Sequence, residues 1–210
     1  MLIRAGRLGG TSIALKVAMT GVVVVAATGL VGGTYATWTS AASQAQAISS
    51  GTVTIALGAT GAATNRLNIS ASAIAPGDTI RRSVDLTNTG TLALSALTLT
   101  TTASPSSVLD TDATNGLQMT VQECSVAWTE SGSSPAFGYT CSGTTTTPVA
   151  SRAVIGSSLA LGSLNALAAG GTDHLQVVLT LPSTADNSFQ GKTSTVTYQF
   201  TGTQRAAGAA

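Results

Sequence analysis

Few side chains in this 210-residue sequence are of the types that do chemistry. It has one histidine, His174, and two cysteines, Cys124 and Cys141. A zinc peptidase of the HExxH type needs two histidines one helical turn apart and a carboxylate base. One histidine cannot supply that set, and His174 falls on the polar side of an alternating segment, where we expect it to face solvent. We therefore predict no catalytic residue, no zinc site and no cofactor.

Two other catalytic patterns fail on spacing. No GxSxG elbow of a serine hydrolase occurs, and Asp173 and His174 are neighbours in a strand, so their side chains point to opposite faces. The stretch 191–193, Gly-Lys-Thr, is similar to the end of a phosphate-binding loop. The first glycine of that motif is replaced by Asp186, and a strand follows instead of a helix. We interpret 191–193 as the turn that enters the last strand.

Four residues come close to a calcium loop: Asp110, Asp112, Asn115 and Gly116. An EF-hand loop takes ligands at positions 1, 3 and 5 and a glycine at position 6, and here the asparagine and the glycine come one residue late. We interpret this segment as a turn held by Asx side chains and predict no metal site there. Calcium binding by Asp110 and Asp112 is the alternative left open.

The number and position of the charged residues limit the kinds of partner that the chain can bind. Charged residues make up 8% of the chain, so no basic surface is available to bind nucleic acid through phosphate contacts. Three basic residues precede position 17, and the first acid is Asp78. Without residues 1–36, six basic and eight acidic residues remain, a net charge of −2. Arg81 and Arg82 are expected at an exposed strand or turn entrance.

The N-terminal residues have the three parts of a secretory signal peptide. Two arginines are followed by an uncharged apolar run at 17–31 and then by small residues. We place signal cleavage between Ala36 and Thr37, so that contact with the membrane ends at cleavage. The apolar run is shorter than the ~20 residues of a membrane span. Residues 12–16 nearly extend it to that length, so an uncleaved anchor is the alternative.

Export places both cysteines in an oxidising compartment, which favours a disulfide between Cys124 and Cys141. Such a bond closes a loop with 16 residues between the partners and stabilises the fold by roughly 3 kcal/mol in the chain-entropy model. Two separate buried thiols are the alternative. The spacing excludes a CxxC redox pair.

The chain after the signal peptide alternates between apolar and polar residues, which is typical of half-buried strands. The alternation is clearest in 52–57, 80–87, 117–122, 174–181 and 195–201. The phase changes within 91–102, which predicts a bulge or a strand break near Ser95. A short helical turn fits 164–169. We count seven to nine short strands, which must bury their apolar faces against each other in a sandwich or a barrel.

Four stretches together resemble the TasA/camelysin family of secreted Gram-positive biofilm proteins. They are 32–39 (GGTYATWT), 48–55 (ISSGTVTI), 75–91 (with Ala-Pro-Gly-Asp-Thr before a strand and Asn-Thr-Gly-Thr after it), and 187–204 (from Asn-Ser-Phe-Gln-Gly-Lys through the last strand). The cysteine-bearing insertion and the Ala- and Thr-rich composition depart from the best-known members.

The resemblance implies an all-β, jelly-roll-like antiparallel β-sandwich preceded by an N-terminal signal-peptide helix. It also implies cleavage after Ala36 by a SipW-type signal peptidase and assembly into extracellular fibres. In such fibres the N-terminal segment of one subunit pairs as a strand with the next subunit. Residues 37–50 are the candidate donor strand, with Trp38 and Ile48 as apolar anchors. A disordered stub is the alternative.

We therefore expect a signal peptide at 1–36, an N-terminal segment at 37–50, a β-sandwich domain at 51–204 with a disulfide-bearing insertion at 124–148, and a flexible tail at 205–210. The predicted function is a secreted, non-catalytic structural protein, a subunit or accessory component of biofilm matrix fibres. Its partners are copies of itself or related matrix subunits. A camelysin-like surface metallopeptidase and a monomeric adhesin with the insertion as its contact surface are the alternatives.

Overall fold

The structure is a computed structural model that describes residues 51–68 and 74–206. The cleavage site between Ala36 and Thr37 and the proposed anchors Trp38 and Ile48 lie outside these residues and stay predictions. Within the described part of the chain, no helix combines the length and the apolar character needed to cross a membrane.

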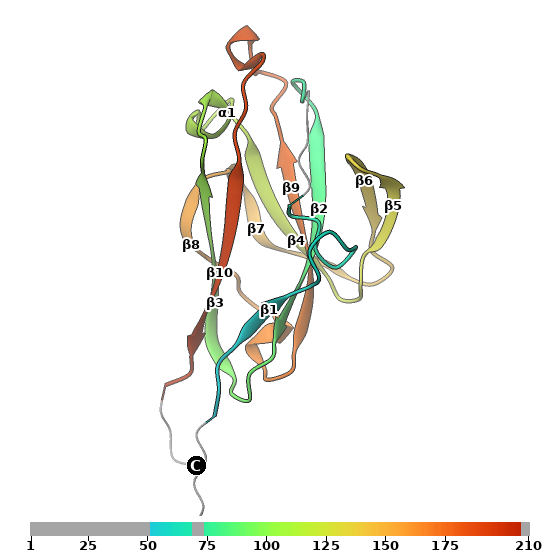
Figure 1. Cartoon of the computed structure of the whole chain (residues 1–210), viewed down its shortest axis with the longest axis vertical. Coiled ribbons are helices and arrows are strands. Elements are labelled where there is room, and N and C mark those ends of the chain that lie inside the picture. The colour runs from blue at the N-terminus through green and yellow to red at the C-terminus, as the bar shows by residue number, and fades with distance from the viewer. Residues whose placement is uncertain (1–50, 69–73, 207–210) are drawn as a thin grey trace, which may run out of the picture. The chain divides into compact units, whose positions relative to one another are not determined.

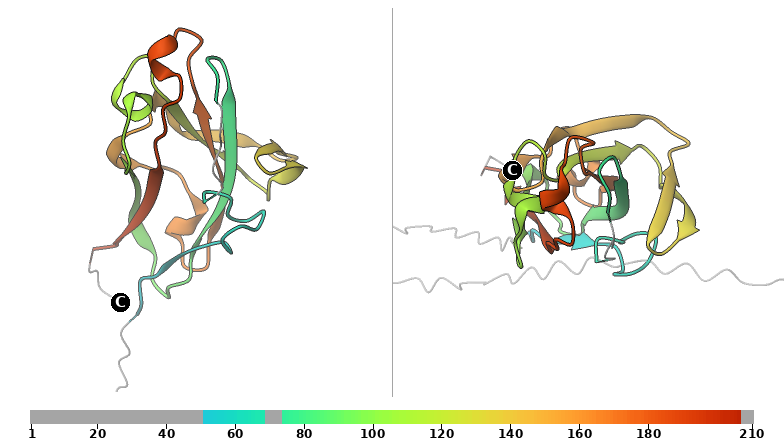
Figure 2. Two further views of the ribbon diagram at one scale, coloured as in Figure 1. Left: turned by 45° about the horizontal axis from the view of Figure 1, so that its top comes forward. Right: turned by 90° about the horizontal axis from the view of Figure 1, so that it is seen from above.

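Two antiparallel sheets pack face to face (Figures 1 and 2). The larger sheet has the order β1-β2-β9-β4-β7, with the bounds β1 Ile55–Leu57, β2 Thr79–Asn88, β9 Thr172–Thr180, β4 Gln118–Cys124 and β7 Thr145–Ala153. The smaller sheet has the order β10-β3-β8, with the bounds β10 Val196–Gln204, β3 Leu94–Ala103 and β8 Gly156–Ala160. This arrangement confirms the predicted all-β antiparallel sandwich.

A hairpin and three short helical turns complete the described chain. The hairpin consists of β5 and β6 and stands beside the larger sheet (Figure 1). The bounds are β5 Thr129–Ser133, β6 Ala136–Thr140, α1 Val108–Thr111, η1 Asn165–Leu167 and η2 Asn187–Phe189. The turn η1 confirms the helical turn expected at 164–169. The described residues form ten strands, more than the seven to nine predicted, because the hairpin adds two and β8 has little apolar alternation to reveal it.

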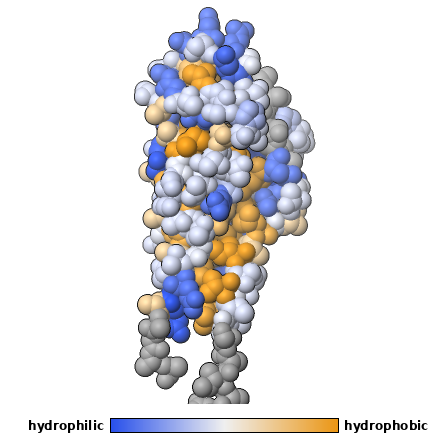
Figure 3. All heavy atoms as spheres, turned by 60° about the vertical axis from the view of Figure 1, so that its left-hand side comes forward, coloured by the Kyte–Doolittle hydropathy of each residue, from blue (hydrophilic) through white to orange (hydrophobic). Residues whose placement is uncertain are grey.

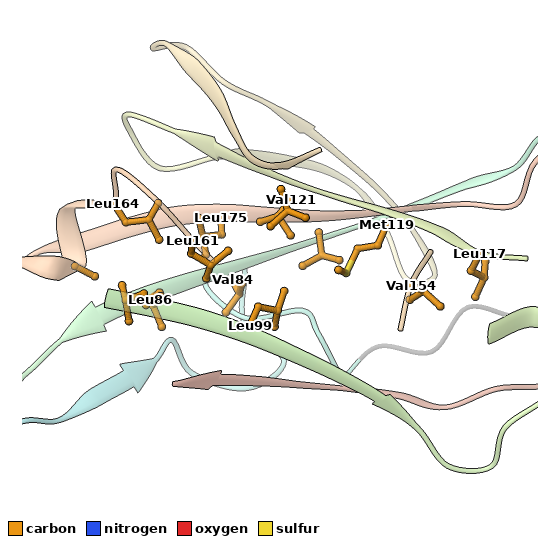
Figure 4. Packing of buried hydrophobic residues seen from close by; sticks show 14 of the residues in the cluster. Val84, Leu86, Leu99, Leu117, Met119, Val121, Val154, Leu161, Leu164 and Leu175 are labelled. Atoms are coloured by element: carbon orange, nitrogen blue, oxygen red, sulfur yellow. The ribbon is translucent and has the colours of Figure 1, made fainter. Parts of the chain in front are cut away.

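The core lies between the two sheets and is built from the apolar side of each alternating strand. Figure 4 labels Val84 and Leu86 from β2, Leu99 from β3, Met119 and Val121 from β4, and Leu175 from β9 in this layer. All six are completely buried. Because side chains alternate along a strand, the Thr, Ser and Gln residues between them take the outer faces. Each fully buried side chain of this size stabilises the fold by about 1.5–3 kcal/mol.

The predicted irregularity near Ser95 is a β-bulge. Thr203 of β10 is opposite Ala96, whereas the next residue, Gln204, is opposite Leu94, so Ser95 is the extra residue of β3. Its hydroxyl lies 3.2 Å from the carbonyl oxygen of Thr203 and 3.0 Å from that of Gln204. The bulge lets Leu94 and the leucines after position 96 point into the same core despite their opposite sequence phase.

Candidate functional site

The smaller sheet ends in a long strand whose outer edge has no partner strand among the described residues. β10 pairs with β3 along its whole length, and β8, at the other edge of this sheet, has only five residues. An unpaired edge presents backbone N–H and C=O groups that can pair with another chain. The nine residues of β10 make it the longest edge strand of either sheet in the described fold, together with β7.

An apolar groove opens between the two sheets beside β10. Its volume is about 510 Å³. The buried residues Leu109, Leu117 and Phe189 line part of it. The rest of the apolar lining comes from both sheets and from the segment before β2: Leu67, Ile74, Ile80, Leu179, Val196 and Tyr198. All six are half-buried, so residues 51–68 and 74–206 do not close the sandwich core on this side. Figure 3 shows apolar surface that reaches the exterior between polar strips.

The hairpin is docked beside β2 by an ion pair. The Arg66 Nε and Nη2 atoms donate to the two carboxylate oxygens of Glu130 at 2.9 and 2.6 Å. The Tyr139 hydroxyl, on the partner strand of the hairpin, donates to Glu130 at 3.1 Å. The hydrogen bond from Arg66 lowers the pKa of Glu130, so this carboxylate stays ionised. The hairpin is thus held to the sandwich by polar contacts.

Arg82 corrects the sequence-based expectation of an exposed side chain. It is only 5% exposed, whereas its neighbour Arg81 is exposed. Its guanidinium donates to the carbonyl oxygen of Pro135 at 3.0 Å and lies 5.5 Å from the ring centre of Phe137. The guanidinium of Arg66 lies 4.7 Å from the centre of the same ring. Phe137 is thus placed against two cations, an arrangement worth about 0.5–1 kcal/mol per contact at exposed sites.

His174 also departs from its expected place. It is half-buried, and its Nδ1 lies 2.8 Å from Oδ1 of Asp85, directly opposite on β2. The Trp128 indole, at the root of the hairpin, donates to the backbone oxygen of His174 at 2.8 Å. Asp173 points to the opposite face, as predicted, and its carboxylate accepts the backbone N–H groups of Asn165 and Ala166.

The predicted disulfide is present. Cys124, at the end of β4, is bonded to Cys141 just after β6, with 5.7 Å between their Cα atoms. β7 resumes the larger sheet at Thr145, opposite Cys124. The bond therefore closes the root of the hairpin, and it is consistent with an extracellular location.

Two acidic residues, Glu123 of β4 and Asp173 of β9, lie on the inner face of the larger sheet. Glu123 accepts a hydrogen bond from the Thr146 hydroxyl at 2.9 Å and is 7% exposed, and Asp173 is completely buried. Burial raises the pKa of Glu123, and the negative charge of Asp173 raises it further, against the hydrogen bond from Thr146. These acids fasten η1 to the end of the sheet, since Asn165 also bonds to both of them.

Residues 110–116, whose sequence comes close to a calcium loop, contain two aspartates that each accept hydrogen bonds from nearby backbone or hydroxyl groups. Asp110 forms a capping box with Ser107 at α1 and accepts the Ser106 hydroxyl at 2.6 Å. Asp112 accepts the backbone N–H groups of Thr114 and Asn115, both at 2.9 Å. The expected Asx turn is therefore present, and the two carboxylates serve different loops.

The other loop prediction is confirmed. Residues 191–193 form the turn that leads from η2 toward β10, and Gly191 has a φ of +67°, a backbone conformation that favours glycine. The Lys192 N–H donates to the carbonyl oxygen of Phe189 at 3.3 Å, which closes this turn.

Sequence reasoning missed the pairs Arg66–Glu130 and His174–Asp85. Their members are 64 and 89 residues apart. Both His174 and Asp85 fall on the polar side of a predicted strand, but only the register of β2 against β9 places them opposite one another. One signal in the sequence could have indicated such pairs. Charged residues make up only 8% of the chain, so the few charged side chains of the domain are candidates for ion pairs with each other.

The described residues do not fit a peptidase zinc site. They contain no group of three or more His, Cys, Asp or Glu side chains that could hold a metal ion. His174 uses Nδ1 for Asp85, and the acid pair Glu123–Asp173 lies on the opposite face of the same sheet. With these donors divided between two faces, we derive no metal-dependent step.

The described residues form an antiparallel β-sandwich with a disulfide-closed hairpin on the larger sheet and an apolar groove beside an edge strand that no other described strand pairs with. The chain belongs to the camelysin metallo-endopeptidase family, whose model matches residues 12–209. This match confirms the resemblance to the TasA/camelysin family. No curated protein is similar enough to the chain to count as a relative.

Proposed function

We propose that this chain is a secreted structural protein, a subunit or accessory component of biofilm matrix fibres that assembles by N-terminal strand exchange. The observation that carries the proposal is the outer edge of β10, which pairs with no other strand of the described chain and lies beside an apolar groove. Strand addition takes its affinity from backbone hydrogen bonds along such an edge and its register from pockets for alternate side chains.

The proposed occupant is the segment 37–50 of a second copy. Fourteen residues span at most roughly 46–50 Å when extended, more than the nine residues of β10 require at ~3.3 Å each. Trp38 and Ile48 are an even number of residues apart, so an extended strand presents both on one face. Their apolar side chains match the half-buried lining of the groove.

Signal cleavage is the proposed switch for assembly. The SipW-type signal peptidase would free Thr37 as a new N-terminus, and a segment still attached to a membrane anchor cannot dock freely into a neighbour. Low charge favours association once the segment is free, because little like-charge repulsion opposes it.

Negative-stain electron microscopy of residues 37–210, beside the same chain without 37–50, tests the proposal. We expect fibres from the longer chain only. Thr197→Lys adds a charge at an exposed position of β10 and should prevent fibres, whereas Ser157→Lys at an exposed position of β8 should leave them intact.

The two alternatives make different predictions for the same samples. A metallopeptidase of the kind the family name describes would cleave protein substrates and lose that activity to a chelator. A monomeric adhesin would stay monomeric at high concentration and lose binding when the hairpin is deleted. Monomers from both chain lengths would reject self-assembly and leave the role of an accessory subunit or a binding module.

A further inference from the structure

Three residues of the larger sheet stand in one row across three neighbouring strands. His174 of β9 is directly opposite Asp85 of β2 on one side and Cys124 of β4 on the other. Directly opposite residues of antiparallel strands share a face, and their Cβ atoms are about 4.5–5.5 Å apart. The order is therefore carboxylate, imidazole and the sulfur of the Cys124–Cys141 disulfide.

The imidazole is held in a defined orientation. Its Nδ1 is engaged by Asp85 at 2.8 Å, which leaves Nε2 for a second partner. The indole of Trp128 donates to the backbone oxygen of the same histidine, so the root of the hairpin is fixed above this row. The other acids near His174, Asp173 and Glu123, belong to the inner face of the sheet. The groups that face the imidazole across the sheet are thus Asp85 and Cys124.

The two sulfurs differ in access. Cys124 is 1% exposed, whereas Cys141 is half-buried. A thiolate from outside therefore reaches Cys141 more easily. The sulfur that leaves is then Cys124, the one beside the imidazole.

We propose that the Cys124–Cys141 disulfide is a site of thiol–disulfide exchange with a dithiol reductant, with His174 assisting the departure of Cys124 and Asp85 as a positioning residue. A reductant thiolate attacks Sγ of Cys141 and forms a mixed disulfide while the Cys141–Cys124 bond breaks. The electron pair passes to Sγ of Cys124, which takes a proton from the protonated imidazole. The second reductant thiol then attacks the reductant sulfur of the mixed disulfide and releases Cys141 as a thiol. The protein gains two thiols, and the dithiol becomes a disulfide.

Attack on Cys141 with departure of Cys124 is the favoured reaction, because a thiol leaves faster when its anion is stabilised. An adjacent imidazolium stabilises a thiolate, as it does in the activated thiols of cysteine enzymes. The site is independent of fibre assembly. Its consequence is local, since exchange opens the root of the hairpin while β5 and β6 stay paired and the Arg66–Glu130 contact still docks β5 on the sandwich.

The test is the rate of reduction of the exported chain by dithiothreitol, followed across about pH 5–8 and divided by the thiolate fraction of the reductant. We expect the corrected rate to rise as the pH falls, because a proton donated from the imidazole side of Cys124 speeds the departure of its sulfur. His174→Gln should abolish this rise and slow the reaction several-fold at the acid end. Thr172→Val is the matched control, because it removes the neighbouring Thr87–Thr172 contact on the same two strands and leaves the row intact. It should behave as the parent chain does.

A monothiol with an acid quench then locates the attacked sulfur by peptide mass mapping. We expect the mixed disulfide on Cys141. If His174→Gln does not fold, Asp85→Asn keeps the imidazole, loses its orientation, and should flatten the pH profile in part. Equal corrected rates in the parent chain and His174→Gln, or a mixed disulfide on Cys124, would overturn the proposal and make the bond a structural cross-link only.

Discussion

Single residues in this protein show how a chain with few charges uses each of them. Glu123 and Asp173 lie buried close together at the end of the larger sheet, and Asn165 bonds to both. The carboxylate of Asp173 accepts the backbone N–H groups of Asn165 and Ala166. Burial raises the pKa of Glu123, and the nearby negative charge of Asp173 raises it further. Glu123 therefore favours its protonated form more than a free glutamate does.

This preference predicts how stability depends on pH. Because the folded-state pKa of Glu123 is raised, its stabilising contribution is complete below the ordinary value of 4.5 and is lost as the pH rises through the raised value. In Glu123→Gln, which keeps the shape without the ionisation, stability should not fall across this window. Urea unfolding midpoints at a series of pH values measure it.

Glu130→Gln serves as the control of opposite sign. The folded-state pKa of Glu130 is lowered by Arg66, so its contribution is present above the ordinary value and is lost as the pH falls. This variant should therefore be less stable than the parent at neutral pH and lose less stability on acidification. If Glu123→Gln keeps the parental decline toward high pH, the buried acid pair is not its source.

Asp110 offers a second prediction at this scale. Burial would raise its pKa, but hydrogen bonds from the Ser106 and Ser194 hydroxyls and the Ser107 N–H lower it overall. Asp110→Ala leaves these donors without their acceptor and should cost about 1–3 kcal/mol in the free energy of unfolding. Ser106→Ala removes one donor and should cost less, about 1 kcal/mol. Equal losses would mean that the carboxylate adds nothing beyond one hydrogen bond.

At the scale of elements, the sequence predicts the features that depend only on residues close together in the chain, such as the position of a strand or a bulge. Alternation placed β2, β4, β9 and β10, and a change of phase located the bulge at Ser95. The hairpin, the buried position of Arg82 and the His174–Asp85 contact depend on register and on partners 53 to 89 residues away. No local pattern contains that information. Strand identity was therefore predictable, whereas the contacts that dock one element on another were not.

The docking of the hairpin gives a prediction for this scale. Arg66 and Glu130 are 20% and 16% exposed and share a two-point contact that Tyr139 extends. A double-mutant cycle with Arg66→Ala and Glu130→Ala should give a coupling energy of about 1 kcal/mol, the upper end for pairs near the surface. Thermal unfolding measures stability, and hydrogen exchange of β5 and β6 reports release of the hairpin.

A distant arginine provides the reference for this cycle. Arg152 is an exposed residue of β7 opposite Met119, at the end of the strand away from the hairpin root at Cys124. Arg152→Ala combined with Glu130→Ala should therefore be additive within about 0.3–0.5 kcal/mol. If both cycles are additive, the ion pair contributes nothing of its own. The disulfide, the hydrogen bonds of Arg82 and Trp128, and the cation–aromatic contacts then hold the hairpin.

At the scale of the whole sandwich, the two sides are built differently. On one side the chain passes directly from β7 to β8, and the buried Thr101 hydroxyl of β3 accepts the Gly156 N–H at 2.8 Å and donates to the carbonyl oxygen of Val154, which fastens this connection to β3. On the other side, Val196 and Tyr198 remain half-buried beside the groove. Burying them further would add stability at roughly 25 cal/mol per Å² of apolar surface, which is a driving force for an added strand.

If an added strand closes this side, a free peptide should compete for it. A synthetic peptide of residues 37–50, added to the chain 37–210, should slow fibre growth in proportion to its concentration. The peptide would occupy the edge of β10, but it carries no sandwich domain to which the next subunit could add. It should also raise the unfolding temperature of the chain that lacks 37–50, since a ligand that binds only the folded state stabilises it. A peptide of the same composition in scrambled order, and one with Trp38→Ala, separate sequence-specific docking from general stickiness. Inhibition by all three peptides alike would show that fibre growth does not depend on the register set by Trp38 and Ile48.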